Sequence, residues 1–364
     1  MSPPLKGLQL SNYRNFINKK EVFKFEHTLF KGKNAVGKTN ILEAISFLCP
    51  GTGFRKDGIQ NFIFQKQEKL KSSITFDFEN EDLENHLTIE LSNKDERWSK
   101  QYFLNDKKIQ QQKLLDIFQL FWFTEIDKVY FIKDTQYQRN TINRIICYFE
   151  PKLFSLLNQY TKLRREKKRI LQSSQDNSWL ISIDKQLFDI GKSIIEIKIE
   201  FLKEFQNFLS DDSKKFFDFE IIPSFGLSEK ENFLEKFQRG LSDESQWPND
   251  HKLQSDHDPK KSIFEITNNQ KNISQLSSAQ SKMLILSLLL SCAKFLNRNR
   301  ITIFLIDEIF DNFDMVNINK VIEYCAENKF QTFFSTTDNF TLKGNICLLY
   351  TSDAADELVG GCLG

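Results

Sequence analysis

The feature that most constrains this chain is an eight-residue segment near the N-terminus that matches the pattern GxxxxGK[ST]. An apolar run that reads as a strand precedes it, and a helix with one apolar face is predicted over Thr39–Leu48. In that context glycines let backbone amides turn toward phosphates, and the helix start adds its positive end. The segment consists of Gly32, Lys33, Asn34, Ala35, Val36, Gly37, Lys38 and Thr39. We expect it to bind nucleotide phosphates, with Lys38 at the β/γ-phosphates and Thr39 holding Mg²⁺.

A second pattern near the C-terminus supplies carboxylates. Residues 301–306 form an apolar run that ends in Asp307 and Glu308. A buried strand is mostly hydrophobic, so two acids directly after one mark the carboxyl edge of a sheet, where ligands bind in open α/β folds. We predict that Asp307 binds Mg²⁺, directly or through water, and that Glu308 polarises the attacking water as a general base.

The spacing of these patterns distinguishes between classes of nucleotide-binding protein. Lys38 and Asp307 are 307 − 38 = 269 residues apart, far more than in a compact GTPase or a small kinase. A serine-rich turn at 276–280 opens a strongly apolar helix ahead of the acidic strand. That order is the layout of the ABC signature, in which serine hydroxyls and helix-start amides contact the γ-phosphate of ATP held by a second subunit. We assign Ser277, Ser278 and Gln280 to this contact, with Asp311–Asp314 as the D-loop and 333–338 as the switch strand.

The remaining periodicities predict how the domains are organised. Alternating apolar residues over 73–104 predict a β-meander, and apolar steps of three and four over 153–208 predict a helical hairpin. A strand is expected at 217–221 and a loop over 241–262. The fold class is therefore α/β, an ABC-type ATPase head with an inserted helical arm. Residues 1–150 and 216–346 would form the head and 151–215 the arm.

The last eighteen residues are treated separately. Cys347–Glu357 reads CLLYTSDAADE, which matches a translated sequencing adapter, so 347–364 is interpreted as an appended artefact outside the fold. Without it the net charge of +1 becomes 50 − 46 = +4. No stretch is apolar enough to span a membrane, no export signal is recognisable, and the six cysteines are scattered. We expect a cytoplasmic protein with no membrane partner.

Beyond the shared motifs, several segments make the chain resemble the RecF family over about residues 5–346. The segments are the opening turn Leu10–Phe16, the helix and turn Asn40–Arg55, the hairpin Phe103–Lys107 and the strand Gln331–Asp338. The resemblance implies that Arg14, in the opening turn, also belongs to the nucleotide site. It also implies an ATP-dependent homodimer in which Ser277 and Ser278 of one subunit cap the nucleotide of the other.

The resemblance further implies partners and a cycle. The closed dimer would clamp DNA near a gap or a single-strand/double-strand junction in replication and recombinational repair, together with recombination mediators of the RecO/RecR type. Hydrolysis at Glu308 would reopen it. A basic cluster on the first arm helix can neutralise phosphates, although a solvated helix face explains it equally well. The cluster consists of Lys162, Arg164, Arg165, Lys167, Lys168 and Arg169.

Some residues depart from the family pattern. Ala35 and Ala279 stand where the family has glycine, and Gln280 replaces an acid, so hydrolysis is expected to be slow. One alternative is therefore a hydrolysis-impaired, ATP-gated DNA-binding module. Another is an SMC-like ABC ATPase in chromosome maintenance, which would need a longer coiled coil than 151–210 can form.

Overall fold

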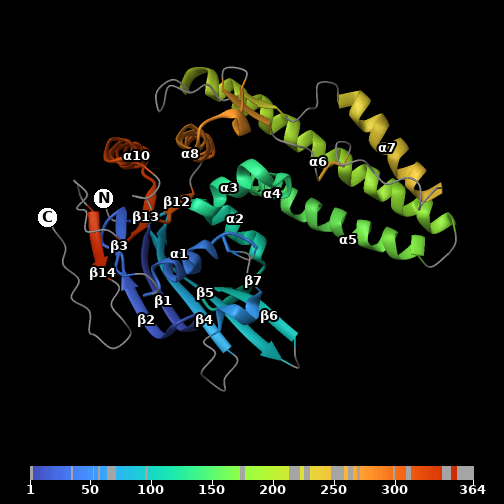
Figure 1. Ribbon diagram of the computed structural model, residues 1–364. Coiled ribbons are helices and arrows are strands. Elements are labelled where there is room, and N and C mark those ends of the chain that lie inside the picture. The colour runs from blue at the N-terminus through green and yellow to red at the C-terminus, as the bar shows by residue number, and fades with distance from the viewer. Residues whose placement is uncertain are drawn as a thin grey trace. The chain divides into compact units, whose positions relative to one another are not determined.

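The computed structural model describes residues 3–33, 36–51, 53–55, 58–63, 71–94, 97–172, 177–212, 222–224, 230–246, 258–260, 265–268, 271–297, 300–308, 313–337 and 346–350. The chain divides into two compact units (Figure 1). The first unit consists of residues 1–125 and 297–364, and the second of 126–296.

The first unit contains an antiparallel sheet of six strands in the order β2-β1-β4-β5-β6-β7. Its central strands alternate: Ile74, Phe76 and Phe78 on β4 are buried, while the residues between them are more exposed. This alternation covers one face of the sheet with apolar side chains and confirms the predicted meander. The strands are β1 (Leu5–Tyr13), β2 (Phe16–Val22), β4 (Lys71–Asn80), β5 (Leu83–Lys94), β6 (Arg97–Leu104) and β7 (Lys107–Ile109).

The same unit contains a parallel sheet in the order β14-β3-β13-β12-β8. Every residue of β8, β12 and β13 is buried, as expected for strands covered on both faces. The strands are β3 (His27–Lys31), β8 (Phe118–Phe123), β12 (Ile301–Ile306), β13 (Gln331–Thr336) and β14 (Ile346–Tyr350). The helices of this unit are α1 (Lys38–Ser46), α2 (Leu114–Ile117) and α10 (Met315–Glu327), with the short turns η1 (Ile59–Phe62) and η2 (Gln111–Lys113).

A single glutamine joins the two sheets at their buried faces. The side chain of Gln331 donates to the Leu5 carbonyl at 2.9 Å and accepts from the Leu5 amide at 2.8 Å. Around it, Phe23 packs edge-on against Phe333 with ring centroids 4.8 Å apart. The amide satisfies a backbone position of β1 that would otherwise be buried without a partner, so both sheets share one core.

The second unit is mainly helical. Helices α5 (Lys152–Gln172) and α6 (Asn177–Asp212) lie side by side as the predicted hairpin, and α7 (Lys230–Gln246) packs on α6 (Figure 1). At one end of α6 the ring of Phe295 contacts those of Phe149, Phe201 and Phe205. The other elements are α3 (Glu125–Lys133), α4 (Thr135–Phe149), α8 (Ser278–Phe295), β9 (Ile222–Ser224), β10 (Glu265–Asn268), β11 (Lys271–Asn272) and η4 (Ile273–Gln275).

Three sequence expectations differ from this architecture. Residues 241–246 are helical rather than a loop, because Phe233, Phe237 and Leu241 of α7 are buried at four-residue intervals. Residues 126–150 and 216–296, both predicted to belong to the head, fall in the second unit together with the arm, where Phe295 at the end of α8 contacts Phe149 of α4 and Phe201 of α6. The predicted strand 217–221 lies outside the described residues, and the nearby strand β9 begins at 222.

The C-terminal segment also differs from expectation. Residues 346–350 form β14, which pairs in parallel with β3 along its whole length. Their sequence, ICLLY, combines β-branched, aliphatic and aromatic residues that suit a strand at a sheet edge. Cys347–Tyr350 therefore takes part in the fold, contrary to our exclusion of it, whereas the adapter origin of the segment stays a prediction.

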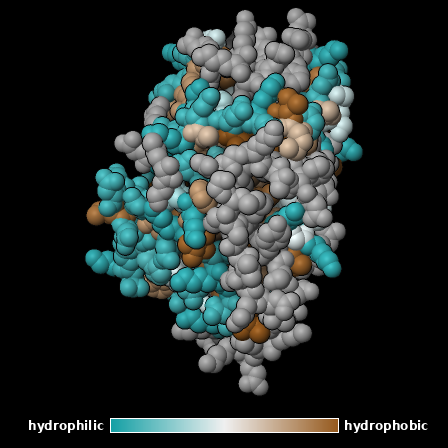
Figure 2. Space-filling view, turned by 90° about the vertical axis from the view of Figure 1, so that its left-hand side faces the viewer, coloured by the Kyte–Doolittle hydropathy of each residue, from teal (hydrophilic) through white to brown (hydrophobic). Residues whose placement is uncertain are grey.

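Figure 2 shows one face of the molecule, on which hydrophilic residues predominate among those described and hydrophobic ones form only small patches. No helix in the described part of the chain is long and apolar enough to cross a membrane.

Candidate functional site

The candidate site lies at one edge of the parallel sheet. Strands β3, β13, β12 and β8 run in the same direction, so their carboxyl ends meet at that edge. In the register, Thr336 pairs with Lys31, directly before the phosphate loop, and Phe334 pairs with Ile306, directly before the acids. The two nucleotide motifs, 269 residues apart in sequence, are thereby brought to the same edge, at the ends of two strands that are separated only by β13.

Gly37 ends the phosphate loop in a conformation that only glycine adopts easily. Its φ is +103°, in the left-handed region, and it is the N-cap of α1. A Cβ at this position would lie 2.5 Å from Cζ of Phe16 and 2.9 Å from Nδ2 of Asn15. The turn between β1 and β2 therefore packs directly against the loop. Asn34 and Ala35 lie outside the described residues.

The lysine of the motif is held over the loop. The side chain of Lys38 is buried, and its Nζ donates to the carbonyls of Gly32 at 2.8 Å and Lys33 at 3.0 Å. These two carbonyls fix the ammonium group within the curve of the loop, close to the start of α1. A cation held at a helix start in this way suits an anionic ligand, as the sequence pattern predicts.

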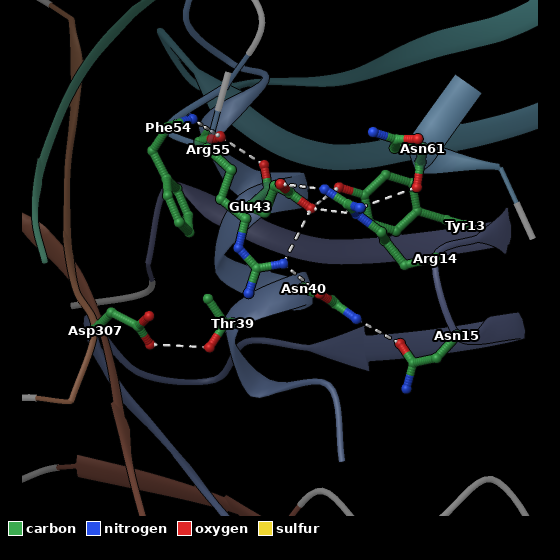
Figure 3. Close-up of polar contacts among 11 residues, drawn as sticks. Tyr13, Arg14, Asn15, Thr39, Asn40, Glu43, Phe54, Arg55, Asn61 and Asp307 are labelled. Carbon is green, nitrogen blue, oxygen red and sulfur yellow. Dashed lines mark hydrogen bonds and ion pairs between the residues drawn. The ribbon is translucent and has the colours of Figure 1, made fainter. Parts of the chain in front are cut away.

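The acidic strand and the phosphate loop meet through a hydroxyl. Thr39 Oγ1 donates to Asp307 Oδ1 at 3.3 Å, and the two side chains point toward each other (Figure 3). Ser335 Oγ donates to the same carboxylate oxygen at 2.5 Å. This convergence of a threonine hydroxyl and a carboxylate is a donor set that suits Mg²⁺, which prefers oxygen ligands from one or two carboxylates.

The electrostatics of Asp307 agree with a cation site. Burial raises the pKa of the Asp307 carboxyl, while the hydroxyls of Ser335 and Thr39 act in the opposite direction. Arg55 and Lys38 also lower it through their charge. A partly buried carboxylate whose main perturbation is loss of water is stabilised in its charged form by a metal ion.

Glu308 follows in an unusual backbone conformation. Its φ is +48°, which is uncommon for a residue with a long side chain. Its amide donates to Ser335 Oγ at 2.9 Å, so the same hydroxyl contacts both acidic residues. Non-glycine residues in this region concentrate at functional sites, where the surrounding structure compensates for the strain. The sequence pattern indicates the strand end at 333–338 but does not single out Ser335 as the link.

Arg14, assigned to the nucleotide by resemblance, lies in a different network. Its guanidinium forms two parallel hydrogen bonds to Glu43, Nε to Oε2 and Nη2 to Oε1, both at 2.7 Å, and also donates to the Asn61 carbonyl (Figure 3). Tyr13 OH donates to Glu43 Oε2 at 3.0 Å. Glu43 is fully buried on α1, so Arg14 fixes that helix to the opening turn. Its nucleotide contact stays a prediction.

A polar chain continues from this ion pair toward the loop. Arg55 Nη1 lies 4.0 Å from Glu43 and donates to Asn40 Oδ1 at 2.9 Å. Asn40 donates to Asn15 Oδ1 at 2.8 Å, which places its amide between the turn at 53–55 and the β1–β2 turn (Figure 3). The exposed face of α1 is thus held on both sides next to Thr39.

The signature turn lies in the second unit and forms a complete capping box. Ser277 Oγ accepts from the Gln280 amide at 3.3 Å, and the Ser277 amide donates to Gln280 Oε1 at 3.0 Å. Gln280, where the family has an acid, therefore serves the cap. Ser277, Ser278 and Gln280 are all exposed. Their contact with a partner's nucleotide stays a prediction.

The structure describes only part of the predicted D-loop, Asp311–Asp314, and of the predicted switch strand, 333–338. Asp314 is the N-cap of α10, with its carboxylate accepting from the Asn317 amide at 2.8 Å. Residues 309–312 and 338 lie outside the described part of the chain.

The basic cluster on α5 is divided by the fold. Arg164 forms a two-pronged ion pair with Glu244 of α7, at 2.5 and 2.9 Å. Lys167 is almost fully buried and lies 2.6 Å from Asp184 and 3.3 Å from Glu244. These two cations hold α7 on the hairpin, so they are not available to DNA. The exposed members are Lys162, Arg165, Lys168 and Arg169.

Comparison with known proteins agrees with this geometry. Residues 4–352 match the family model described as RecF/RecN/SMC N terminal domain. The chain belongs to this family. A relative from Rickettsia conorii, named DNA replication and repair protein RecF, is 26% identical over 370 residues, covering 95% of this chain and 99% of the relative.

Two solved structures share the fold. The recombination mediator protein RecF with ATP, in the RecFOR pathway, matches with a TM-score of 0.81 at 21% identity, covering 98% of each chain. The Smc head domain of Pyrococcus furiosus, with an extended coiled coil and bound to the C-terminal domain of ScpA, matches with a TM-score of 0.57 at 18% identity, covering 99% of this chain and 96% of that one. The predicted ABC-type head with a helical arm and the resemblance to RecF are confirmed.

Proposed function

We propose that this chain is an ATP-dependent DNA-binding protein of RecF type that acts at gaps or single-strand/double-strand junctions in replication and recombinational repair. The observation that carries the proposal is the meeting of Lys38, Thr39, Asp307 and Glu308 at one sheet edge, with Ser335 linking the two acids. The name of the Rickettsia relative, which covers 95% of this chain, supports the biological setting.

Each residue of the site has a distinct role in this proposal. Bound ATP with Mg²⁺ supplies the phosphoanhydride bond and the metal's charge. Lys38 binds the β/γ-phosphates, and Thr39 and Asp307 hold the metal through their oxygens. Glu308 would accept a proton from the attacking water, and the hydrogen bond from its amide to Ser335 would hold its backbone in place. Arg14 and Glu43 orient α1, which carries Thr39.

Dimerisation and partners follow from the family pattern. In this proposal Ser277 and Ser278, which are exposed at the start of α8, would cap a nucleotide held by a second copy, so ATP would close a head-to-head homodimer. Recombination mediators of the RecO/RecR type are the expected protein partners.

The decisive experiment measures three properties of one set of variants: nucleotide affinity, mass by light scattering, and ATP hydrolysis with and without gapped DNA. The wild type should bind ATP, dimerise with it and hydrolyse it slowly. Lys38→Ala should lose all three properties. Glu308→Gln should keep binding and dimerisation while losing hydrolysis, whereas the matched change Glu79→Gln, on a partly exposed residue of β4, should resemble the wild type. A wild type that stays monomeric with ATP would contradict the proposed cycle.

A second candidate is a hydrolysis-impaired module that uses ATP only to gate DNA binding. Ala279, at the start of the signature helix where the family has glycine, favours it. The same assay separates the two candidates, because the impaired module would hydrolyse ATP no faster than its Glu308→Gln variant while still dimerising.

A further inference from the structure

The tip of the α5–α6 hairpin combines exposed cations with an exposed aromatic ring. Lys162, Arg165 and Arg169 recur on α5 at steps of three and four residues, so they share one face of the helix, and Lys168 lies beside them. Trp179, in the first turn of α6, is 62% exposed. None of the four cations forms an ion pair with another described residue.

The Lys167–Asp184 ion pair gives the register of the two helices. Because α5 and α6 run antiparallel, a contact between residues 167 and 184 brings position 172 level with Trp179. Trp179 therefore lies about one helical turn beyond Arg169 along the hairpin, so it continues the row of cations that begins at Lys162. From Lys162 to that level is about 15 Å at 1.5 Å per residue, which matches about four nucleotides of a stacked strand at 3.4 Å each.

The charge of this surface is one-sided. Among the exposed residues described in 162–172 and 179–189, Asp189, level with Lys162 at the end away from Trp179, is the one carboxylate, and Lys185 adds a further cation. The half-buried Glu166 is the nearest negative charge on α5, while Asp184 and Glu244 form ion pairs with Lys167 and Arg164. The internal ion pairs thus neutralise the cations that face α7 and leave those that face solvent uncompensated.

We infer that this tip is a binding site for single-stranded nucleic acid, with the four cations on the phosphates and Trp179 stacked on a base. Cations following a backbone beside an exposed aromatic ring are the means by which proteins bind single strands without reading sequence. A duplex keeps its bases stacked and hidden, so Trp179 selects the single strand. The inference rests on the proposed DNA function and assigns the single-stranded side of a gap to this part of the chain.

The test uses full-length protein, ATP and two fluorescent probes, a 20-nucleotide oligo(dT) and a 20-base-pair duplex, read by anisotropy. Trp179→Ala should weaken oligo(dT) binding by about 5- to 150-fold, the effect of losing one stacked base, and should change duplex binding little. Trp179→Phe should restore most of the loss. The double variant Arg165→Glu, Arg169→Glu should weaken binding and flatten its salt dependence, whereas the matched double variant Lys192→Glu, Lys203→Glu on the exposed face of α6 should have a smaller effect.

The outcomes separate this inference from the proposed function. If the wild type binds neither probe, both are overturned. If it binds both probes and Trp179→Ala binds oligo(dT) equally well, or loses both probes to the same degree, only the inference fails. If Trp179→Ala changes the mass in light scattering and leaves oligo(dT) affinity intact, the tip is an interface between copies of the chain, and the inference is likewise overturned.

Discussion

Glu43 lies fully buried on α1 and accepts three hydrogen bonds, two from Arg14 and one from Tyr13. Glu43→Ala would remove the carboxylate that accepts two hydrogen bonds from the Arg14 guanidinium, a side chain that is only 15% exposed. Removing one member of a buried ion pair costs about 3–5 kcal/mol, and the partial exposure of Arg14 argues for the lower end, about 3 kcal/mol. With a urea m-value of about 2 kcal/mol/M, the unfolding midpoint would fall by about 1.5 M.

The assay must report on the first unit alone, because the two units can unfold separately. Urea unfolding in a Trp179→Phe, Trp247→Phe background achieves this, since the remaining tryptophans at 98 and 122 lie in the first unit. The matched control is Glu79→Ala, which removes a partly exposed ion pair to Lys6 and should cost less than about 1 kcal/mol. Equal midpoint shifts for Glu43→Ala and Glu79→Ala would refute the reasoning.

Three further predictions concern pH, the loop and the arm. Burial lowers the pKa of His27 to about 4, so below about pH 6.5 the unfolded chain binds more protons than the folded chain. The free energy of unfolding should therefore fall by about 3 kcal/mol between pH 6.5 and pH 4. Urea titrations of His27→Gln across that range should show a flatter dependence of stability on pH. Gly37→Ala should weaken ATP binding and destabilise the first unit by about 1–3 kcal/mol in urea titrations. The control Gly51→Ala should destabilise it less, because a Cβ at position 51 meets nothing within 4 Å whereas one at position 37 meets Phe16. Equal losses of stability in the two variants would contradict this reasoning. Glu244→Ala removes the carboxylate that the half-buried Arg164 binds and leaves the buried Lys167 with Asp184 as its ion-pair partner. Hydrogen exchange of α7 amides should therefore accelerate while α1 amides are unchanged, and unaltered α7 protection would contradict the role of the ion pairs.

The elements predicted well are those whose periodicity is set by one-sided burial. The meander alternates because β4 and β5 each bury one face, and the hairpin seam repeats because α5 and α6 pack along one stripe. The order of strand, loop and helix at Gly32–Thr39 is local, so the sequence alone contains it. The acidic strand was recognisable because an apolar run ending in two acids has few structural explanations.

The failures come from contacts between distant residues. Arg14 and Glu43 are 29 residues apart, and neither periodicity nor a motif predicts their pairing. The same holds for Arg164 and Lys167, whose partners lie on α7 and α6. Helix α7 did carry a signal, apolar residues at four-residue steps, but its many charges concealed it. The unit boundary at 126 and 296 depends on aromatic packing at Phe295, which only the three-dimensional arrangement shows.

The hydroxyl at position 335 limits which residues can occupy that site. It donates to Asp307 and accepts from the Glu308 amide through one oxygen, inside a strand that is buried throughout. Alanine, glycine or valine would satisfy neither contact. An amide or imidazole would have to be accommodated in a strand in which every residue is already buried. Threonine keeps the oxygen but adds a methyl group to a fully packed strand. In a saturation mutagenesis experiment, position 335 should therefore be nearly as intolerant as Gly37, for a chemical rather than a conformational reason.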